Sequence, residues 1–223
     1  MKHSQSEFID QLLVDQSSIR ASSSSLSRLI VWGLFSSIFL FLLYKFLWGF
    51  RPRFYSEFSD LFFLAESMLP FLASFWALSF AFKLGTPGRA APPPLLAISA
   101  VLMFFYILFQ AINYLQPSGV YTMAGKRPMC HVEIMVYSTA LWGVFIFLMR
   151  TAAPVKKRTQ SFLIGFSCAS LNVGMMQISC MYEPLHILKL HVGPLIVFTL
   201  ITTLIGEKFL RWDKKSPNFL GSK

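Results

Sequence analysis

Charged residues are scarce in this sequence: Asp, Glu, Lys and Arg make up 13% of its 223 residues, whereas an ordinary soluble domain carries about 25%. Apolar residues account for 55%, which is more than a single core of this size can hide from water. These proportions exclude an ordinary soluble protein and favour the bilayer as the solvent. Residues 1–28 are polar and include acids, unlike a cleavable signal peptide, so we expect the first apolar run to remain as an anchor.

Cysteine is also scarce, and common catalytic motifs are missing. The three cysteines allow at most one internal pair, which excludes a scaffold built on disulfides. The sequence has no phosphate-binding glycine loop, no nucleophile elbow, no zinc-protease helix motif and no Cys-x-x-Cys pair. We therefore expect a protein that is not an enzyme and has no resident cofactor.

Six long apolar runs are what the sequence does contain. A helix that crosses a membrane needs roughly 20 mostly apolar residues, and a helix satisfies its own backbone hydrogen bonds in lipid. The predicted spans cover residues 29–47, 61–82, 95–115, 132–149, 162–181 and 188–206. The sequence thus predicts an all-α polytopic membrane bundle at 29–206, between a tail at 1–28 and a basic tail at 207–223.

The basic residues set the expected orientation of this bundle. A formal net charge of +10 would suggest nucleic acid as the partner of a soluble protein. In membrane proteins, however, Lys and Arg concentrate in the cytoplasmic loops, and here most of the 20 fall on the side that holds both chain ends. We therefore predict cytoplasmic N- and C-termini, contact with the lipid bilayer, and no direct contact with nucleic acid.

The N-terminal tail carries an apolar stripe. Phe8, Ile9, Leu12 and Leu13 recur at helical spacing, and a run of serines at 22–25 separates them from the first span. Such a helix could rest on the membrane surface, or it could serve as a docking peptide for a cytoplasmic partner. Periodicity alone does not separate these two interpretations.

Reactive side chains gather at the predicted extracytoplasmic ends of the last three spans. They are Cys130, His131, Cys180, Glu183, His186 and His191. Cys130 and Cys180 lie at the ends of adjacent predicted helices. They could form a redox switch, bind a thiophilic metal transiently with the nearby His or Glu side chains, or be unrelated. Cys168 lies about 18 Å deeper along its helix, and we expect it to be a small buried apolar side chain.

One acidic residue, Glu66, lies inside the second predicted span. An ionisable group there is costly and is by default a functional hypothesis, although hydrogen bonding within the bundle would also account for it. Two further functions stay open on these residues. One is a small membrane transporter that uses Glu66, and the other is a membrane redox protein that uses the cysteines or histidines.

Seven short segments follow one another along nearly the whole chain. They are FIDQLLVDQ, RPRF, FKLGTPGR, MCHVEI, LMRTAAPVKKRTQSFLIGF, CMYEPLHILKLHVGP and EKFLRW. In this order and spacing they resemble the NrsF family of bacterial membrane anti-sigma factors. The resemblance implies a protein that holds an extracytoplasmic-function sigma factor at the inner membrane, away from RNA polymerase, and releases it under heavy-metal or oxidative stress.

The resemblance also implies roles for particular residues. Family members carry cysteines at the positions of Cys130 and Cys180, which are tied to sensing, whereas Cys168 is outside the pattern. Glu183 stands where members often have an aspartate. We expect oxidation or metal binding at the two cysteines to shift the fourth and fifth spans. The loop at 150–160 and the N-terminal tail would then move, and the docking surface for the sigma factor would be lost.

Overall fold

The computed structural model describes residues 25–47, 49–52, 54–85, 93–116, 125–149 and 156–210. Within these residues six helices are long and apolar enough to cross a membrane, which confirms the all-α fold with six spans. The predicted apolar stripe of the tail, from Phe8 to Leu13, lies outside the described residues, as does most of the basic C-terminal tail. The side of the membrane that holds the termini stays a prediction.

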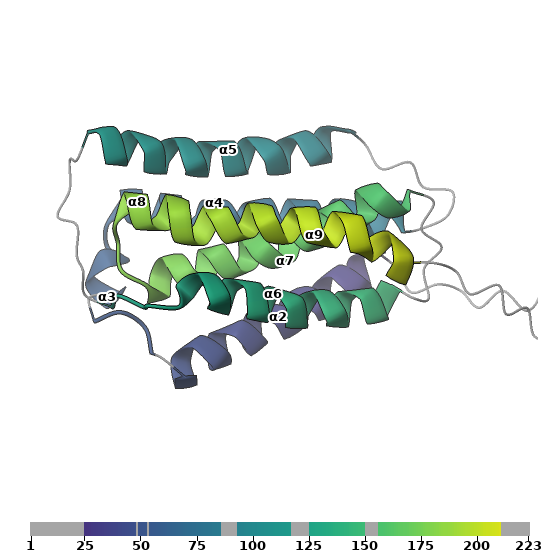
Figure 1. The fold of residues 1–223 in the computed structure, drawn as a ribbon, viewed down its shortest axis with the longest axis horizontal. Coiled ribbons are helices and arrows are strands. Elements are labelled where there is room, and N and C mark those ends of the chain that lie inside the picture. Colours follow the sequence, from purple (N-terminus) through teal and green to yellow (C-terminus); the bar gives the residue numbers. More distant parts are fainter. Residues whose placement is uncertain are drawn as a thin grey trace, which may run out of the picture.

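The long helices lie side by side in one bundle (Figure 1). In chain order the elements are α2 (Ser25–Leu47), α3 (Phe54–Glu57), α4 (Leu61–Leu84), α5 (Pro93–Leu115), α6 (Cys130–Met149), α7 (Lys157–Ser179), α8 (Pro184–Ile187), the π-helical turn η1 (Leu188–Val192) and α9 (Gly193–Phe209). The last three form one continuous rod. Each predicted span corresponds to one long helix or rod. The helix α7 begins ahead of the predicted residue 162 because its polar first turn is helical without being apolar.

Two carboxylates fix where two of the helices begin. Asp60 precedes α4 and accepts a hydrogen bond from the backbone N–H of Phe62 at 2.9 Å. Glu183 precedes α8 and accepts from the N–H groups of Leu185 at 3.1 Å and His186 at 2.8 Å. Side-chain acceptors in this position satisfy amides that have no partner within the helix. Glu183 therefore sets the start of the rod and the register of the histidine that follows.

The helix α7 is the centre of the bundle. In its apolar window 94% of the residues are buried within the protein, against 17% for α2, and α7 contacts α2, α4, α6 and α9. Its sequence mixes Ser, Gly, Cys, Asn and Gln with apolar residues, a composition that suits contact between helices inside a membrane. The helix α2 is rich in Leu and Phe, many of which are exposed on the outside of the bundle.

Small residues let α7 and α9 approach each other closely. A Cβ added at Gly165 would lie 1.8 Å from Oγ1 of Thr202, and one added at Gly206 would lie 2.8 Å from Oγ of Ser161. Protein interiors packed at this density are poorly compressible. A displacement of α7 along this contact must therefore be followed by α9.

This packing predicts the effect of adding one methyl group. Gly165→Ala should lower the stability of the bundle by roughly 1–3 kcal/mol, the usual cost of overpacking. The matched control is Gly143→Ala on α6, where the new Cβ meets nothing within 4 Å and helix propensity favours alanine by about 0.5–1 kcal/mol. Thermal unfolding in detergent should show a lower midpoint for the first variant alone. Equal midpoints for the two variants would contradict the close packing of α7 on α9.

Candidate functional site

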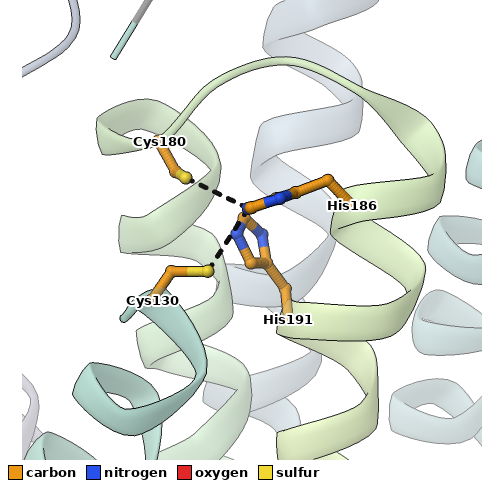
Figure 2. Close-up of side chains that lie close together, drawn as sticks. All are labelled: Cys130, Cys180, His186 and His191. Atoms are coloured by element: carbon orange, nitrogen blue, oxygen red, sulfur yellow. Dashed lines mark hydrogen bonds between the residues drawn. The ribbon is translucent and has the colours of Figure 1, made fainter. Parts of the chain in front are cut away.

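Four side chains from separate parts of the chain meet at one end of the bundle (Figure 2). Cys130 is the first residue of α6, and Cys180 directly follows α7. His186 belongs to α8 and His191 to η1. Their sulfur and nitrogen atoms all lie within 4.8 Å of one another. We refer to these four residues as the Cys2His2 cluster.

The cluster is enclosed by protein. Cys130, Cys180 and His191 are fully buried, and His186 is 8% exposed. Nε2 of His186 lies 3.3 Å from the sulfur of Cys130 and 3.3 Å from the sulfur of Cys180, so one imidazole nitrogen bridges both thiols. Neither ring nitrogen of His191 has a hydrogen-bond partner among the described residues. A buried polar atom without a partner is costly, and this one faces the two sulfurs and the other imidazole.

A π-helical turn brings the two histidines together. Side chains five positions apart on a regular α-helix point about 140° apart, so His186 and His191 would face different sides. In η1 the N–H of Gly193 donates instead to the carbonyl of Leu188, five residues earlier, which widens the turn. The two imidazole rings consequently lie 5.3 Å apart at an interplanar angle of 85°. Single π-helical turns of this kind occur often at functional sites.

Hydrogen bonding makes Cys180 the more acidic of the two cluster thiols. The Cys130 thiol, which donates to the sulfur of Cys180, lowers the pKa of Cys180 well below its usual value, and His186 beside it acts in the same direction. Burial opposes this effect but does not cancel it. The thiolate is the form of cysteine that attacks oxidants and binds metals. These contacts favour Cys180 over Cys130 as the sulfur that carries the negative charge.

The residues present fit a thiophilic metal ion. Two cysteines and two histidines are a common ligand set for zinc, in which ligand atoms lie roughly 3.3–3.8 Å apart. The sulfur–nitrogen separations of 3.3 Å fall in that range, and no pair of ligand atoms exceeds 4.8 Å. Soft thiolates together with imidazoles also suit copper(I) and other thiophilic ions. Small side-chain movements would bring the four ligand atoms to the separations of a metal site, and one nitrogen of His191 would then have a partner.

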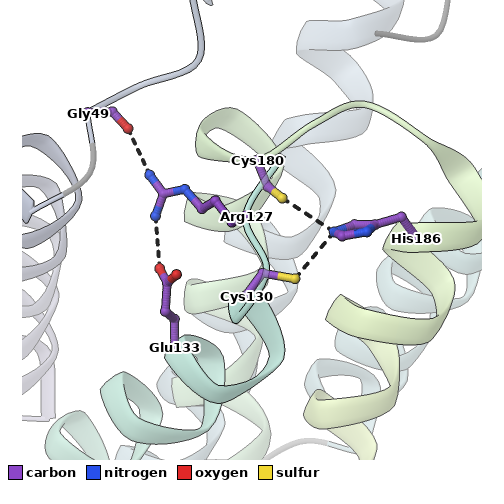
Figure 3. A network of polar contacts seen from close by, with 6 residues as sticks. All are labelled: Gly49, Arg127, Cys130, Glu133, Cys180 and His186. Atoms are coloured by element: carbon purple, nitrogen blue, oxygen red, sulfur yellow. Dashed lines mark hydrogen bonds and ion pairs between the residues drawn. The ribbon is translucent and has the colours of Figure 1, made fainter. Parts of the chain in front are cut away.

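Two buried arginines, Arg51 and Arg127, border the cluster, and Figure 3 shows Arg127 with its partners. Arg127 donates to the carboxylate of Glu133 and to the carbonyl of Gly49, each at 2.8 Å. Arg51 donates to the carbonyl of Cys180 at 3.3 Å and pairs with Glu57. Burial lowers the pKa of Arg51, and the carboxylate of Glu57 opposes that shift. These contacts connect the segment after α2 and the segment before α6 to the end of α7.

A family model matches most of the chain. The family model described as negative regulator of sigma F, NrsF, matches residues 14–212. This chain belongs to the NrsF family. Comparison with curated proteins and with solved structures gives no match. The NrsF match spans all six long helices and the whole Cys2His2 cluster, and the family description supports an anti-sigma factor.

Within this NrsF chain the six predicted reactive residues do not all meet. The cluster contains Cys130, Cys180, His186 and His191. His131 and Glu183 are outside it, because Glu183 caps α8 and His131 is not within reach of the other ligand atoms. Cys168 is fully buried in α7, away from the cluster.

Sequence reasoning gave no role to the two arginines. Both lie on the side that the charge count had marked as poor in basic residues, so each went against the bias used to assign topology. Their position on that side was the feature of the sequence that could have indicated a structural role for them. Their buried partners, a backbone carbonyl at Cys180 and the carboxylate of Glu133, depend on tertiary contacts that no local pattern contains.

The two sulfurs are placed for direct oxidation to a disulfide. Mild oxidation of the purified NrsF protein should join Cys130 to Cys180, because their sulfur atoms lie within 4.8 Å and a disulfide needs only a modest approach of the two side chains. Peptide mass spectrometry under non-reducing conditions measures the product. Cys168→Ser should give the same yield as the unchanged protein. A product that contains Cys168 would contradict the arrangement described here.

Proposed function

We propose that this NrsF protein is an anti-sigma factor that holds an extracytoplasmic-function sigma factor at the bacterial inner membrane. It releases the sigma factor when the Cys2His2 cluster is oxidised or binds a thiophilic metal. The observation that carries the proposal is the enclosed cluster, which joins α6, the end of α7 and the α8–η1–α9 rod at one end of the bundle. The family description supports the regulatory half of the proposal.

Both signals act on the same two sulfurs. In oxidation, the Cys130 and Cys180 thiols lose two protons and two electrons, and a sulfur–sulfur bond forms. The oxygen–oxygen bond of a hydroperoxide-class oxidant breaks, and the oxidant takes up the protons and electrons to give an alcohol and water, or two waters from hydrogen peroxide. The sulfur atoms then lie about 2.05 Å apart. In metal binding the two cysteines and two histidines would hold the ion, with sulfurs roughly 3.8 Å apart. A disulfide would draw the start of α6 toward the end of α7, and a bound metal would in addition tie both to the rod through His186 and His191.

The size of the required effect separates the two signals. Shifting a two-state protein from 1:99 to 99:1 takes about 5.5 kcal/mol of differential binding. Structural Cys/His zinc sites supply about 10–16 kcal/mol at neutral pH, whereas a disulfide typically supplies about 2–4 kcal/mol. Only the part of this free energy that differs between the two states shifts the balance. Metal binding reaches the required scale if the sigma-bound state cannot close the cluster around the ion, and a disulfide contributes a smaller shift.

The central helix is the route by which the signal crosses the membrane. The helix α7 carries Cys180 just beyond one end and begins at Lys157 at the other. Its contacts with α9 at Gly165 and Gly206 leave no room for one helix to slide past the other. A displacement of α7 at the cluster would therefore reach the far end of both helices. The excess of Lys and Arg on the side of that far end supports a cytoplasmic location for it, where it would meet the sigma factor.

The docking surface for the sigma factor belongs to this cytoplasmic side. The apolar stripe of Phe8, Ile9, Leu12 and Leu13 suits a groove of a partner protein. The predicted loop at 150–160 leads into α7, whose first turn includes its last four residues. Release follows when movement of α7 removes this surface. The transporter alternative raised by the sequence gains no specific support, because both oxygens of Glu66 are held in hydrogen bonds within the bundle.

Capture of the sigma factor from cells tests the proposal. The tagged protein should co-purify a small sigma factor before stress and lose it after cadmium treatment. Cys130→Ser and Cys180→Ser should retain the sigma factor under cadmium because each removes a ligand. Cys168→Ser, which changes a buried cysteine outside the cluster, should behave like the unchanged protein. Deletion of residues 1–20 should abolish capture and leave the protein in the membrane.

Two results would contradict distinct parts of the proposal. Release from Cys130→Ser that matches release from the unchanged protein would remove the cluster from the sensing role. Capture that survives the deletion would remove the N-terminal stripe from the docking role. Cadmium is the probe in both cases because it is thiophilic and does not change oxidation state.

A further inference from the structure

Glu66 of α4 is hydrogen-bonded to residues on both sides of Cys180 in the chain. Its side chain is 1% exposed, and its two carboxylate oxygens accept hydrogen bonds from different residues. Oε1 accepts from Nε2 of Gln177 at 2.8 Å, and Oε2 accepts from the hydroxyl of Tyr182 at 2.6 Å. Gln177 lies three residues before Cys180 and Tyr182 lies two residues after it. One carboxylate therefore fixes the chain both before and after Cys180.

This turn needs support from outside its own helix. The N–H of Cys180 donates to the carbonyl of Met176 at 2.8 Å, but the residue itself has extended backbone angles, so the helical ladder ends there. Beyond it the backbone direction depends on tertiary contacts. The carbonyl of Cys180 accepts from Arg51, and the side chains on either side are held by Glu66.

The partners of Glu66 are themselves fixed in orientation. The hydroxyl of Tyr106 donates to Oε1 of Gln177 at 3.0 Å, so the Gln177 amide is engaged at both its oxygen and its nitrogen. The ring of Tyr182 packs edge-on against Phe63 with centroids 5.8 Å apart. A buried network in which each member has a partner is rigid. The Glu66 carboxylate joins its two halves.

We propose that Glu66 is a positioning residue for Cys180, which locks Gln177 and Tyr182 so that the sulfur meets Cys130 and His186. This assignment rests on the proposed sensing role of Cys180. It gives the intramembrane acid a function that requires no transport. Removing the carboxylate should free the chain at Cys180 while leaving the rest of α7 in place, because α7 is held elsewhere by its own contacts.

The test measures alkylation of each cysteine by a small maleimide in the reduced, metal-free protein in detergent. In Glu66→Leu, Cys180 should react about tenfold faster, the scale set by loss of a buried hydrogen bond that holds a local segment closed. Cys168, in the middle of α7, should keep its rate and serves as the internal control. Tyr182→Phe removes one hydroxyl and keeps the ring, and should accelerate Cys180 by a smaller factor.

The matched control removes a different hydrogen bond between the same two helices. Ser74 of α4 donates to the carbonyl of Ser167 on α7 at 2.8 Å, well away from Cys180 in the sequence. Ser74→Ala should leave the rate at Cys180 unchanged. Glu66→Gln, which keeps the volume and one acceptor oxygen, should fall between the unchanged protein and Glu66→Leu.

The outcomes distinguish this inference from the proposed function. Rates at Cys180 that are the same in Tyr182→Phe, Glu66→Leu and Ser74→Ala would overturn the positioning role. If Glu66→Leu exposes Cys168 as well, the fold has been lost, and the rate in Tyr182→Phe decides the matter. No sigma factor and no metal are present in this measurement, so failure of the sensing proposal would show only in the capture experiment.

Discussion

The structure depends on the meeting of two sulfurs and two imidazoles in a space closed to water. Cys130, Cys180 and His191 are fully buried, and buried polar groups are stable only when they have partners. His186 supplies one partner to both sulfurs, while the ring of His191 has none among the described residues. The cluster is thus ordered but incomplete. A thiophilic ion bound there would give His191 a partner, and the site connects three segments whose opposite ends lie across the bundle.

In the proposed mechanism, the central helix carries a change at this site to the other end of the bundle. The helix α7 is buried on nearly all sides, and its small residues allow contacts that larger side chains would prevent. In lipid the hydrophobic effect does not drive helices together, so close packing and hydrogen bonds carry that role. The contact of Gly165 with Thr202 and the hydrogen bonds of Glu66 belong to this class. A helix held in this way moves as a body or not at all, which suits a relay between two sides of a membrane.

Sequence analysis predicted the six spans and the level at which the reactive residues gather, because apolar run length and residue type are local properties. It did not predict which histidines join the cysteines. A regular α-helical register separates His186 from His191, and only the π-helical turn brings them together. The sequence also did not predict the partners of Glu66, because Gln177 and Tyr182 lie more than a hundred residues away in the chain. Glu183, a candidate ligand by residue type, instead caps α8, a role that its position before Pro184 was compatible with from the start.

The central claim is that a change at the cluster moves the far end of α7. Pulsed EPR distances between spin labels carried on non-cysteine amino acids at Arg158 of α7 and Leu26 of α2, both exposed near that end, measure the movement of α7 against an outer helix of the bundle. The distance distribution should shift when cadmium is added to the otherwise unchanged protein, and it should stay fixed in Cys180→Ser. A distribution that does not move under conditions that release the sigma factor would contradict a relay through α7.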